Sequence, residues 1–180
     1  MSRILILYAT TEGHTARIAE RIAQRLWGMG QVVEAYGADA IPASVDFTAY
    51  DGIILGASVH YGHHPGYLRA LLRRQRAAFA ARPSAFFSVS LSASGSDARS
   101  ETAQRYLETF LRQVDWHPPQ TATFAGALQY SKYGIFKKLV MRLIAHMVGN
   151  DTDTTRDYEY TDWDAVARFA DTFAQRFEQT

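Results

Sequence analysis

The residues best suited to chemistry in this chain lie in a short hydroxyl-rich segment near the N-terminus. An apolar run over residues 4–8 breaks directly into residues 9–15, and a helical pattern begins at Ala16. A buried strand followed by such a turn exposes free backbone N–H groups, and the positive end of the helix dipole points at the same place. This arrangement is a common binding site for a phosphate group. The alternative is a strand-to-helix turn with a threonine cap and no ligand.

The composition of this loop restricts the kind of phosphate that it could hold. Neither G-x-x-x-x-G-K-[ST] nor G-x-G-x-x-G occurs in it, which disfavours a P-loop triphosphatase and a dinucleotide site. The loop offers threonine hydroxyls and has no lysine to neutralise a triphosphate, which suits one terminal monophosphate, as in FMN. An acidic side chain repels phosphate, so we expect Glu12 to point outward while its backbone N–H contributes. The predicted phosphate loop comprises Thr10, Thr11, Glu12, Gly13, His14 and Thr15.

The composition predicts a globular protein with a single domain over residues 1–180. Hydrophobic residues make up 47% of the chain and charged residues 21%, which excludes a disordered protein. The chain has no cysteine, so disulfides, thiolate catalysis and cysteine-ligated iron–sulfur clusters are excluded. No apolar stretch resembles a signal peptide or reaches the length of a transmembrane helix. We therefore expect a cytoplasmic protein.

Positive charge is concentrated in two segments, although the net charge is only +1. Residues 69–76 carry four arginines and no acid, and residues 130–149 are also free of acids. The basic residues of the second segment are Lys132, Lys137, Lys138 and Arg142. Such patches indicate an anionic partner, which could be a membrane surface, an acidic ligand or nucleic acid. For residues 69–76 a solvated helix face is the interpretation that we favour.

The elements that must position the phosphate loop alternate between strands and helices along the chain. Apolar runs predict strands at residues 3–8, 31–36, 52–56, 85–89 and 121–128. Helices are predicted at residues 15–28, 65–80, 101–114 and 162–178, the last opening with a capping box that begins at Thr161. Apolar strands separated by helices predict a parallel sheet that is covered on both faces. We expect an α/β fold, a doubly wound five-stranded parallel sheet in the flavodoxin-like order.

A long insertion over residues 130–160 separates the fifth predicted strand from the last helix. Within it, residues 134–148 have the period of a helix with one wide apolar stripe and basic residues off that stripe. A basic amphipathic helix of this kind either packs onto the core or lies on a membrane or a hydrophobic ligand. Both interpretations stay open from the sequence.

Two further loops should reach the same edge of the sheet as the phosphate loop. In open α/β sheets a ligand lies outside the carboxyl ends of the strands, here between strands one and three. Small residues such as Gly56 would allow a close approach, and Tyr61 could stack on a flat ring such as the isoalloxazine of FMN. The candidates are Ala57, Ser58, Val59, His60, Tyr61 and Gly62 in one loop, and Ser88, Val89, Ser90 and Leu91 in the other.

Three histidines in and just after the loop at residues 57–62 raise the question of a metal site. His60, His63 and His64 are accompanied by no nearby carboxylate or cysteine, and their spacing is not that of a zinc motif. We predict no metal and interpret them as ligand-facing or exposed groups. The serines at residues 88–92 lack a G-x-S-x-G elbow, so a serine hydrolase is not indicated.

Five motifs of the chain, taken together, resemble those of one family. They are Thr10-x-x-Gly13-x-Thr15, Gly56-Ala57-Ser58-x-x-Tyr61-Gly62-His63, Phe124-Ala125-Gly126-Ala127-Leu128-x-Tyr130, Thr152-Asp153-Thr154 and Tyr160-Thr161-Asp162-Trp163. On these motifs the chain resembles the bacterial flavodoxin-fold, menaquinone-dependent protoporphyrinogen IX dehydrogenases. The first motif is common to all flavodoxins, whereas the last three flank the basic insertion and distinguish this family.

This resemblance implies an FMN enzyme that oxidises protoporphyrinogen IX to protoporphyrin IX for haem synthesis and passes the electrons to menaquinone. It also implies attachment to the inner face of the cytoplasmic membrane without spanning it, and no nucleic-acid partner. The basic insertion would serve an anionic membrane surface and the substrate's propionates. The flavin carries the redox chemistry, so we assign no catalytic side chain. The alternatives are a flavodoxin-type electron carrier and an FMN-dependent NAD(P)H:quinone reductase.

Overall fold

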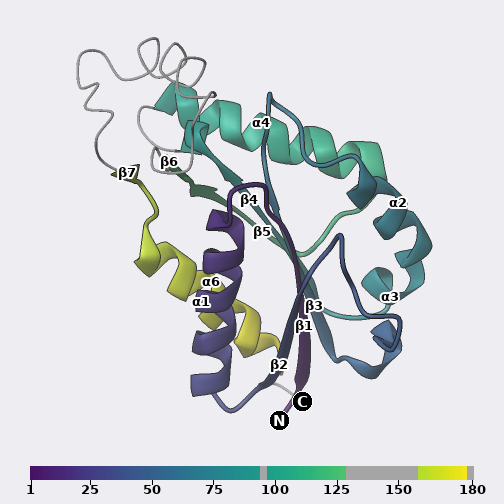
Figure 1. Ribbon diagram of the computed structural model, residues 1–180. Coiled ribbons are helices and arrows are strands. Elements are labelled where there is room, and N and C mark those ends of the chain that lie inside the picture. The colour runs from purple at the N-terminus through teal and green to yellow at the C-terminus, as the bar shows by residue number, and fades with distance from the viewer. Residues whose placement is uncertain (94–96, 129–157, 178–180) are drawn as a thin grey trace.

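The apolar runs of the sequence form one parallel sheet in the computed structural model, which describes residues 1–93, 97–128 and 158–177 (Figure 1). The strand order is β2-β1-β3-β4-β5. The strands are β1 (Arg3–Ala9), β2 (Val32–Gly37), β3 (Gly52–Ser58), β4 (Ser84–Ser90) and β5 (Gln120–Ala125). All neighbours pair in parallel, and the chain reverses its direction of progress across the sheet between β1 and β3. The predicted doubly wound, flavodoxin-like fold is confirmed.

Helices cover both faces of this sheet because successive side chains of a buried strand point to opposite faces. Ile4 and Ile6 of β1 face one apolar cluster, with α1 (His14–Gly28) and α6 (Trp163–Ala174). Leu5 and Leu7 face the other, with the remaining helices (Figure 1). Those helices are α2 (Tyr67–Arg74), α3 (Arg76–Ala80) and α4 (Asp97–Val114). Complete burial of one such leucine or isoleucine contributes about 2 kcal/mol.

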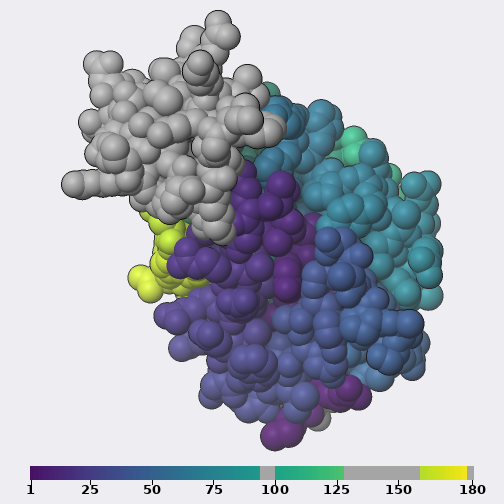
Figure 2. Space-filling model, viewed as in Figure 1, coloured from purple at the N-terminus to yellow at the C-terminus, as the bar shows by residue number. Residues whose placement is uncertain are grey.

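One face of the molecule is formed mostly by the N-terminal part of the chain. In Figure 2, α1 and the chain that follows it through β2 occupy the middle of the visible face. Residues at helical spacing on α1, including Ile18, Ile22 and Leu26, are fully buried against the sheet. In the same view α6 appears only at the edge behind α1.

Several predicted helices have different boundaries in the structure, and the one predicted over residues 101–114 begins at Asp97. The helix predicted over residues 65–80 begins at Tyr67 and is broken at Gln75, whose φ of −104° and ψ of 16° lie outside the helical region. The break separates α2 from α3, which buries Ala78 and Phe79. The last helix ends at Ala174 and continues only as a 3₁₀ turn over Gln175–Phe177. Apolar periodicity predicts the buried face of a helix but not a change of axis within it.

The predicted capping box of the last helix is wrong by one residue. Asp162, with extended backbone angles, is the N-cap of α6, and its carboxylate accepts a 2.9 Å hydrogen bond from the Ala165 N–H. Thr161 instead donates its hydroxyl to the Ala125 carbonyl oxygen, at 2.8 Å. The sequence Thr-Asp offers two capping residues in a row, and the contact with β5 decides between them.

The fifth predicted strand is also shorter than expected, because the chain leaves the sheet at Gly126. The next residues form β6 (Ala127–Leu128), which pairs antiparallel with β7 (Tyr158–Glu159) and joins the two ends of the insertion. The predicted helix over residues 134–148, together with Lys132, Lys137, Lys138 and Arg142, lies outside the described residues. Among the helices that the structure does describe, none is long and apolar enough to cross a membrane.

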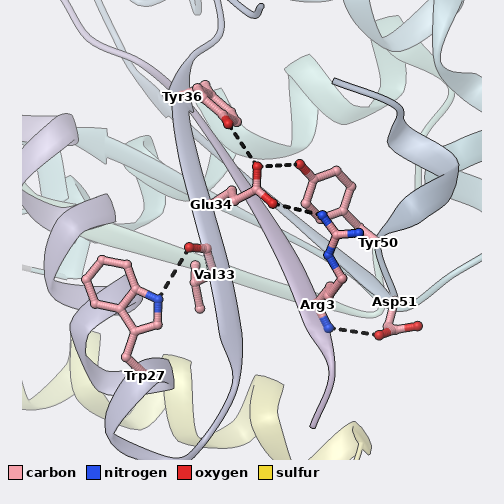
Figure 3. A network of polar contacts seen from close by, with 7 residues as sticks. All are labelled: Arg3, Trp27, Val33, Glu34, Tyr36, Tyr50 and Asp51. Carbon is pink, nitrogen blue, oxygen red and sulfur yellow. Dashed lines mark hydrogen bonds and ion pairs between the residues drawn. The ribbon is translucent and has the colours of Figure 1, made fainter. Parts of the chain in front are cut away.

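A polar network secures the strand β2 at the edge of the sheet (Figure 3). The Glu34 carboxylate accepts hydrogen bonds from the Arg3 guanidinium at 3.0 Å, the Tyr36 hydroxyl at 2.8 Å and the Tyr50 hydroxyl at 2.9 Å. These donors lower the pKa of Glu34, with Tyr36 the largest cause. Burial, together with Glu34, raises the pKa of Tyr50 to about 12. The network ties β1, β2 and the segment before β3 into one unit.

Candidate functional site

The predicted site residues lie along the carboxyl edge of the sheet, where three neighbouring strands end together. Ala9 of β1 is paired with Ala57 of β3, and Ala57 is paired with Ser88 of β4. The three segments that follow therefore emerge side by side, at the top of Figure 1. The structure thus brings together the phosphate loop, the loop after β3 and the end of β4, as parallel pairing requires.

The phosphate loop leads into α1 through a glycine in the left-handed region. Gly13 is the N-cap of α1, with a φ of 90°, and its N–H donates to Thr10 Oγ1 at 2.9 Å. No side chain of the described residues caps the first turn of α1, so its backbone N–H groups stay available to an anion. The threonine cap of the alternative interpretation is not formed among the described residues, so these N–H groups can donate to an anion.

The side chains of this loop differ in their exposure. Thr11 is exposed and Thr10 half-buried, whereas Thr15 is only 1% exposed within α1. The Thr10 oxygen accepts the Gly13 bond and keeps its own hydrogen for a ligand. Glu12 is half-buried, and its carboxylate partly offsets the fall in the pKa of His14 that burial causes.

The loop after β3 presents an aromatic ring at this edge. His60 and His63 exchange two backbone hydrogen bonds, of 2.8 and 3.0 Å, around a tight turn. The two central residues, Tyr61 and Gly62, have φ values of 49° and 79°, which is the pattern of a type I′ turn. The Tyr61 side chain is 80% exposed. An exposed ring on a rigid two-residue turn can stack on a planar ligand without rearrangement.

Buried hydroxyls at the ends of β3 and β4 have unused hydrogen-bonding capacity. The Oγ atoms of Ser58 and Ser90 are buried and have no partner among the described residues. An unpaired buried hydroxyl costs about 1–3 kcal/mol unless a ligand or water satisfies it. Ser58 ends β3 and Ser90 ends β4, at the same edge of the sheet as the phosphate loop, so both hydroxyls fit a polar ligand bound along this edge.

The histidines near the turn lie in different surroundings. His64 is buried against the rings of Phe86 and Phe110, at centroid distances of 5.5 and 4.8 Å, and its Nε2 lies 2.9 Å from Ser88 Oγ. Burial lowers the pKa of His64 to about 4, so its ring is neutral at neutral pH. His63 Nδ1 contacts the Tyr61 carbonyl oxygen at 2.8 Å. The interpretation of His64 as a ligand-facing or exposed group is wrong, because its ring fills the core.

Gly56 was expected to allow a ligand close to the backbone, and this expectation is wrong. It lies inside β3, and a Cβ built there would be 2.0 Å from Cζ of Phe87. The absence of a side chain at Gly56 makes room for the Phe87 ring on the face of the sheet that α1 and α6 cover. Glycine at this position serves packing.

A contact that the sequence did not predict joins the phosphate loop to the segment before α6. His14 Nε2 lies 2.6 Å from Thr161 Oγ1, and the Thr161 hydroxyl donates its one hydrogen to Ala125. Thr161 must therefore accept from His14, which places the ring proton on Nε2. His14 Nδ1 is then a bare acceptor, buried and without a partner in the described part of the chain.

A second set of contacts reinforces this junction. Arg17 of α1 forms a 2.9 Å ion pair with Glu159 of β7, and the Trp163 indole donates to the same carboxylate at 2.6 Å. The Arg17 guanidinium also lies over the Trp163 ring, 5.7 Å from its centroid. The strands that close the insertion are thus fastened to the first turn of α1. The motif at residues 160–163 was visible in the sequence, but its contacts with α1 reach across more than 140 residues.

Comparison with protein-family models identifies the family to which a chain with this fold and site belongs. Residues 5–155 match the model described as a flavodoxin domain. The chain belongs to the flavodoxin family. Within this flavodoxin family, two curated relatives extend over almost the whole chain, and both are named protoporphyrinogen IX dehydrogenase (quinone).

The flavodoxin-family chain is 37% identical over 176 residues to the protein from Leishmania major, which covers 96% of the chain and 74% of that relative. It is 33% identical over 168 residues to the protein from Escherichia coli K12, covering 93% of the chain and 92% of the relative. The family resemblance inferred from the sequence motifs is confirmed.

A solved structure supports the fold of this flavodoxin-family chain. Oxidised flavodoxin 1 from Bacillus cereus superimposes with a TM-score of 0.57, covering 97% of this chain and 98% of that structure. The two sequences are 16% identical, so this likeness concerns the fold alone.

Proposed function

We propose that this protein is an FMN-dependent dehydrogenase that oxidises protoporphyrinogen IX and passes the electrons to a quinone. The observation that carries the proposal is sequence identity of 33–37% over nearly the full chain to relatives whose names state this activity. The carboxyl edge provides independent support, because its donors and unpaired hydroxyls fit a phosphate-bearing ligand with a flat ring.

The uncapped N–H groups at the start of α1 and the hydroxyls of the loop would hold the phosphate of FMN. These residues are Thr10, Thr11, Glu12, Gly13, His14 and Thr15, with Glu12 contributing its backbone only. The segments 57–62 and 88–91 would hold the ring, and the exposed Tyr61 side chain could stack on it. The hydroxyls of Ser58 and Ser90, buried and unpaired among the residues described, find their partners in the cofactor or in water bound with it. When bound, FMN would supply the two-electron redox chemistry that links the substrate to the quinone.

The protein's own contribution is positioning and exclusion of water. The N-terminal end of α1 stabilises the anionic phosphate, and no acid lies in its first turn. His14 and His64 are both buried, and burial lowers the pKa of each. We assign no proton-transfer residue, in line with a reaction whose chemistry belongs to the cofactor.

The proposed dehydrogenase acts with a quinone acceptor, a porphyrin substrate and a membrane surface. The acceptor is menaquinone or a similar membrane quinone, and the product protoporphyrin IX enters haem synthesis. The protein binds peripherally to the inner face of the cytoplasmic membrane through the basic insertion at residues 130–160. The four basic residues at residues 130–149, in a stretch without acids, suit both an anionic lipid surface and a substrate with propionate groups. We propose no metal and no nucleic-acid partner.

The test of the activity uses the purified full-length protein reconstituted with FMN. A flavin absorption spectrum should appear on reconstitution, and anaerobic protoporphyrinogen IX should be converted to fluorescent protoporphyrin IX when a menaquinone analogue is present. FMN alone and apoprotein alone are the controls. Flavin-loaded protein that is inert in this assay would contradict the proposal. Rapid NAD(P)H oxidation without porphyrinogen would instead indicate a quinone reductase.

Membrane binding by the insertion can be tested separately from the activity. The double variant Lys137→Glu with Lys138→Glu should bind anionic vesicles more weakly, since each basic residue contributes about 1 kcal/mol near such a surface. Vesicle co-sedimentation measures this, with neutral vesicles and an Arg105→Glu variant as controls. Unchanged binding to anionic vesicles would show that the basic residues of the insertion do not contact the membrane.

A further inference from the structure

A cavity of about 620 Å³ lies at the amino ends of β4 and β5, at the edge of the sheet opposite the phosphate loop. We name it the amino-edge pocket. It is formed by α3, the segment leading into β4, the turn after α4 and Arg176 behind α6. Its volume is in the range of sites for small molecules. Nothing in the proposed dehydrogenase chemistry uses it.

The charge of the amino-edge pocket is predominantly positive. Arg76, Arg82, Arg176 and His117 line it together with a single acid, Asp115. Arg76 is paired with Asp115 at 2.7 Å, which leaves two guanidinium groups without an ion pair among the described residues. An anionic group entering the pocket would therefore meet two guanidinium groups that form no ion pair with a described carboxylate, although Asp46 lies near enough for Arg82 to help lower its pKa.

These two guanidinium groups also have unused hydrogen-bond donors. Arg82 donates to the carbonyl oxygens of Ala78 and Thr48, at 2.9 and 3.4 Å. Arg176 donates one 3.3 Å bond to the Pro119 carbonyl oxygen, and its buried Nε has no partner in the part of the chain that is described. A guanidinium has five N–H donors, arranged as a fork that matches a carboxylate. The buried Nε atom in particular favours an acceptor supplied from outside.

Two aromatic rings line the pocket together with these donors. Trp116 and Phe79 meet edge-to-face at 5.0 Å, and both line the pocket. Trp116 is held in place by the turn that ends α4, in which its N–H donates to the Leu111 carbonyl oxygen at 3.2 Å. Asp115 adopts a positive φ of 50° in this turn, an uncommon conformation outside glycine. The turn therefore fixes an apolar ring next to the unpaired guanidinium groups.

We propose that the amino-edge pocket is a second ligand site, which binds a small aromatic carboxylate. The flat ring of the ligand lies against Trp116 and Phe79, and its carboxylate accepts hydrogen bonds from Arg176 and Arg82. The site is separated from the FMN loops by the length of the strands, so both can be occupied at once. The inference stands independently of the reaction at the carboxyl edge.

The test is fluorine NMR of the full-length, FMN-loaded protein labelled with fluorotryptophan, titrated with naphthoate. The chain has three tryptophans, Trp27, Trp116 and Trp163, which give three resonances that Trp→Phe variants assign. We expect the Trp116 resonance to move saturably while the other two stay in place. Naphthalene methanol, which has the ring without the charge, should bind at least tenfold more weakly.

Variants then test the guanidinium groups. Arg176→Gln and, separately, Arg82→Gln should each weaken naphthoate binding about tenfold or more, because each removes a charge-assisted hydrogen bond. Arg105→Gln, an exposed arginine of α4 that donates to Thr102, should leave binding unchanged. A Trp116 resonance that does not move, equal binding of naphthalene methanol, or wild-type affinity in both pocket variants would each overturn the proposal.

Discussion

His14 and Thr161 are joined by a 2.6 Å hydrogen bond across 147 residues of sequence. His14 is the first residue of α1, directly after the phosphate loop, and Thr161 directly precedes the N-cap of α6. The bond therefore connects the predicted FMN phosphate site with the closing end of the insertion. Arg17, Glu159 and Trp163 strengthen the same junction.

Replacing Thr161 by valine should destabilise the protein by about 1–3 kcal/mol, because His14 loses its acceptor and Ala125 its donor in a buried setting. FMN affinity should fall as well, since His14 belongs to the turn that binds the phosphate. Urea unfolding and FMN fluorescence titration measure the two effects. Thr172→Val is the matched control, because the Thr172 hydroxyl only returns to its own helix, at Arg168. Equal stability of the two variants would contradict this role of Thr161.

Gly13→Ala should be destabilising by about 1–2 kcal/mol, because a left-handed φ of 90° is unfavourable for a residue with a Cβ. It should also weaken FMN binding by distorting the first turn of α1. Gly28→Ala, near the end of the same helix, provides the comparison, since nothing lies within 4 Å of a Cβ at that position. That variant should be neutral or slightly stabilising. Thermal unfolding of both, with and without FMN, shows whether the effects separate as expected.

Ser90→Ala should change the apoprotein and the FMN-loaded protein in opposite directions. Removing a buried hydroxyl that has no partner in the described chain should stabilise the apoprotein by up to about 1 kcal/mol. The same change should weaken FMN binding if the hydroxyl bonds the cofactor. Ser88→Ala, by contrast, should destabilise the apoprotein because it leaves His64 Nε2 unpaired. A Ser90→Ala apoprotein that is as unstable as the Ser88→Ala apoprotein would show that Ser90 is already satisfied.

The buried His64 should make the protein less stable in acid. Its pKa is about 4 in the folded protein and close to 6.5 when unfolded, so the unfolded state binds the proton more readily. The contribution is complete above pH 6.5, falls as the pH drops to about 4 and is constant below that. The loss from this residue is on the order of 3 kcal/mol.

Urea unfolding between pH 7 and pH 4 measures this dependence, and His64→Gln should flatten it. His14, whose pKa is also lowered by burial, adds a slope of the same sign that the His64 variant retains. The difference between wild type and variant therefore isolates His64. An identical pH dependence in the two proteins would rule out His64 as its source.

The strands and the turn that begins α1 could be predicted from the sequence because both depend on local patterns, and the strand order followed from the flavodoxin-like arrangement. Apolar runs such as residues 4–8 and 52–56 must be buried on both faces, and parallel pairing then brings the loops after β1, β3 and β4 to one edge. The family motifs led to the prediction of FMN as the cofactor and of protoporphyrinogen IX oxidation as the reaction. The helix break at Gln75 carried no such signal, because a buried stripe continues across a change of helix axis.

By itself, the sequence determined the sheet, the layers of helices and the segments that meet at the carboxyl edge, since residue periodicity and turn chemistry act over short distances. The tertiary structure alone decided what each polar side chain does. It placed His64 in the core, paired His14 with Thr161, and left Ser58 and Ser90 without partners among the described residues. It also gathered Arg82, Arg176 and Trp116 into one pocket. Hydrogen bonds form between side chains that folding brings within about 3 Å, and no local pattern records that distance.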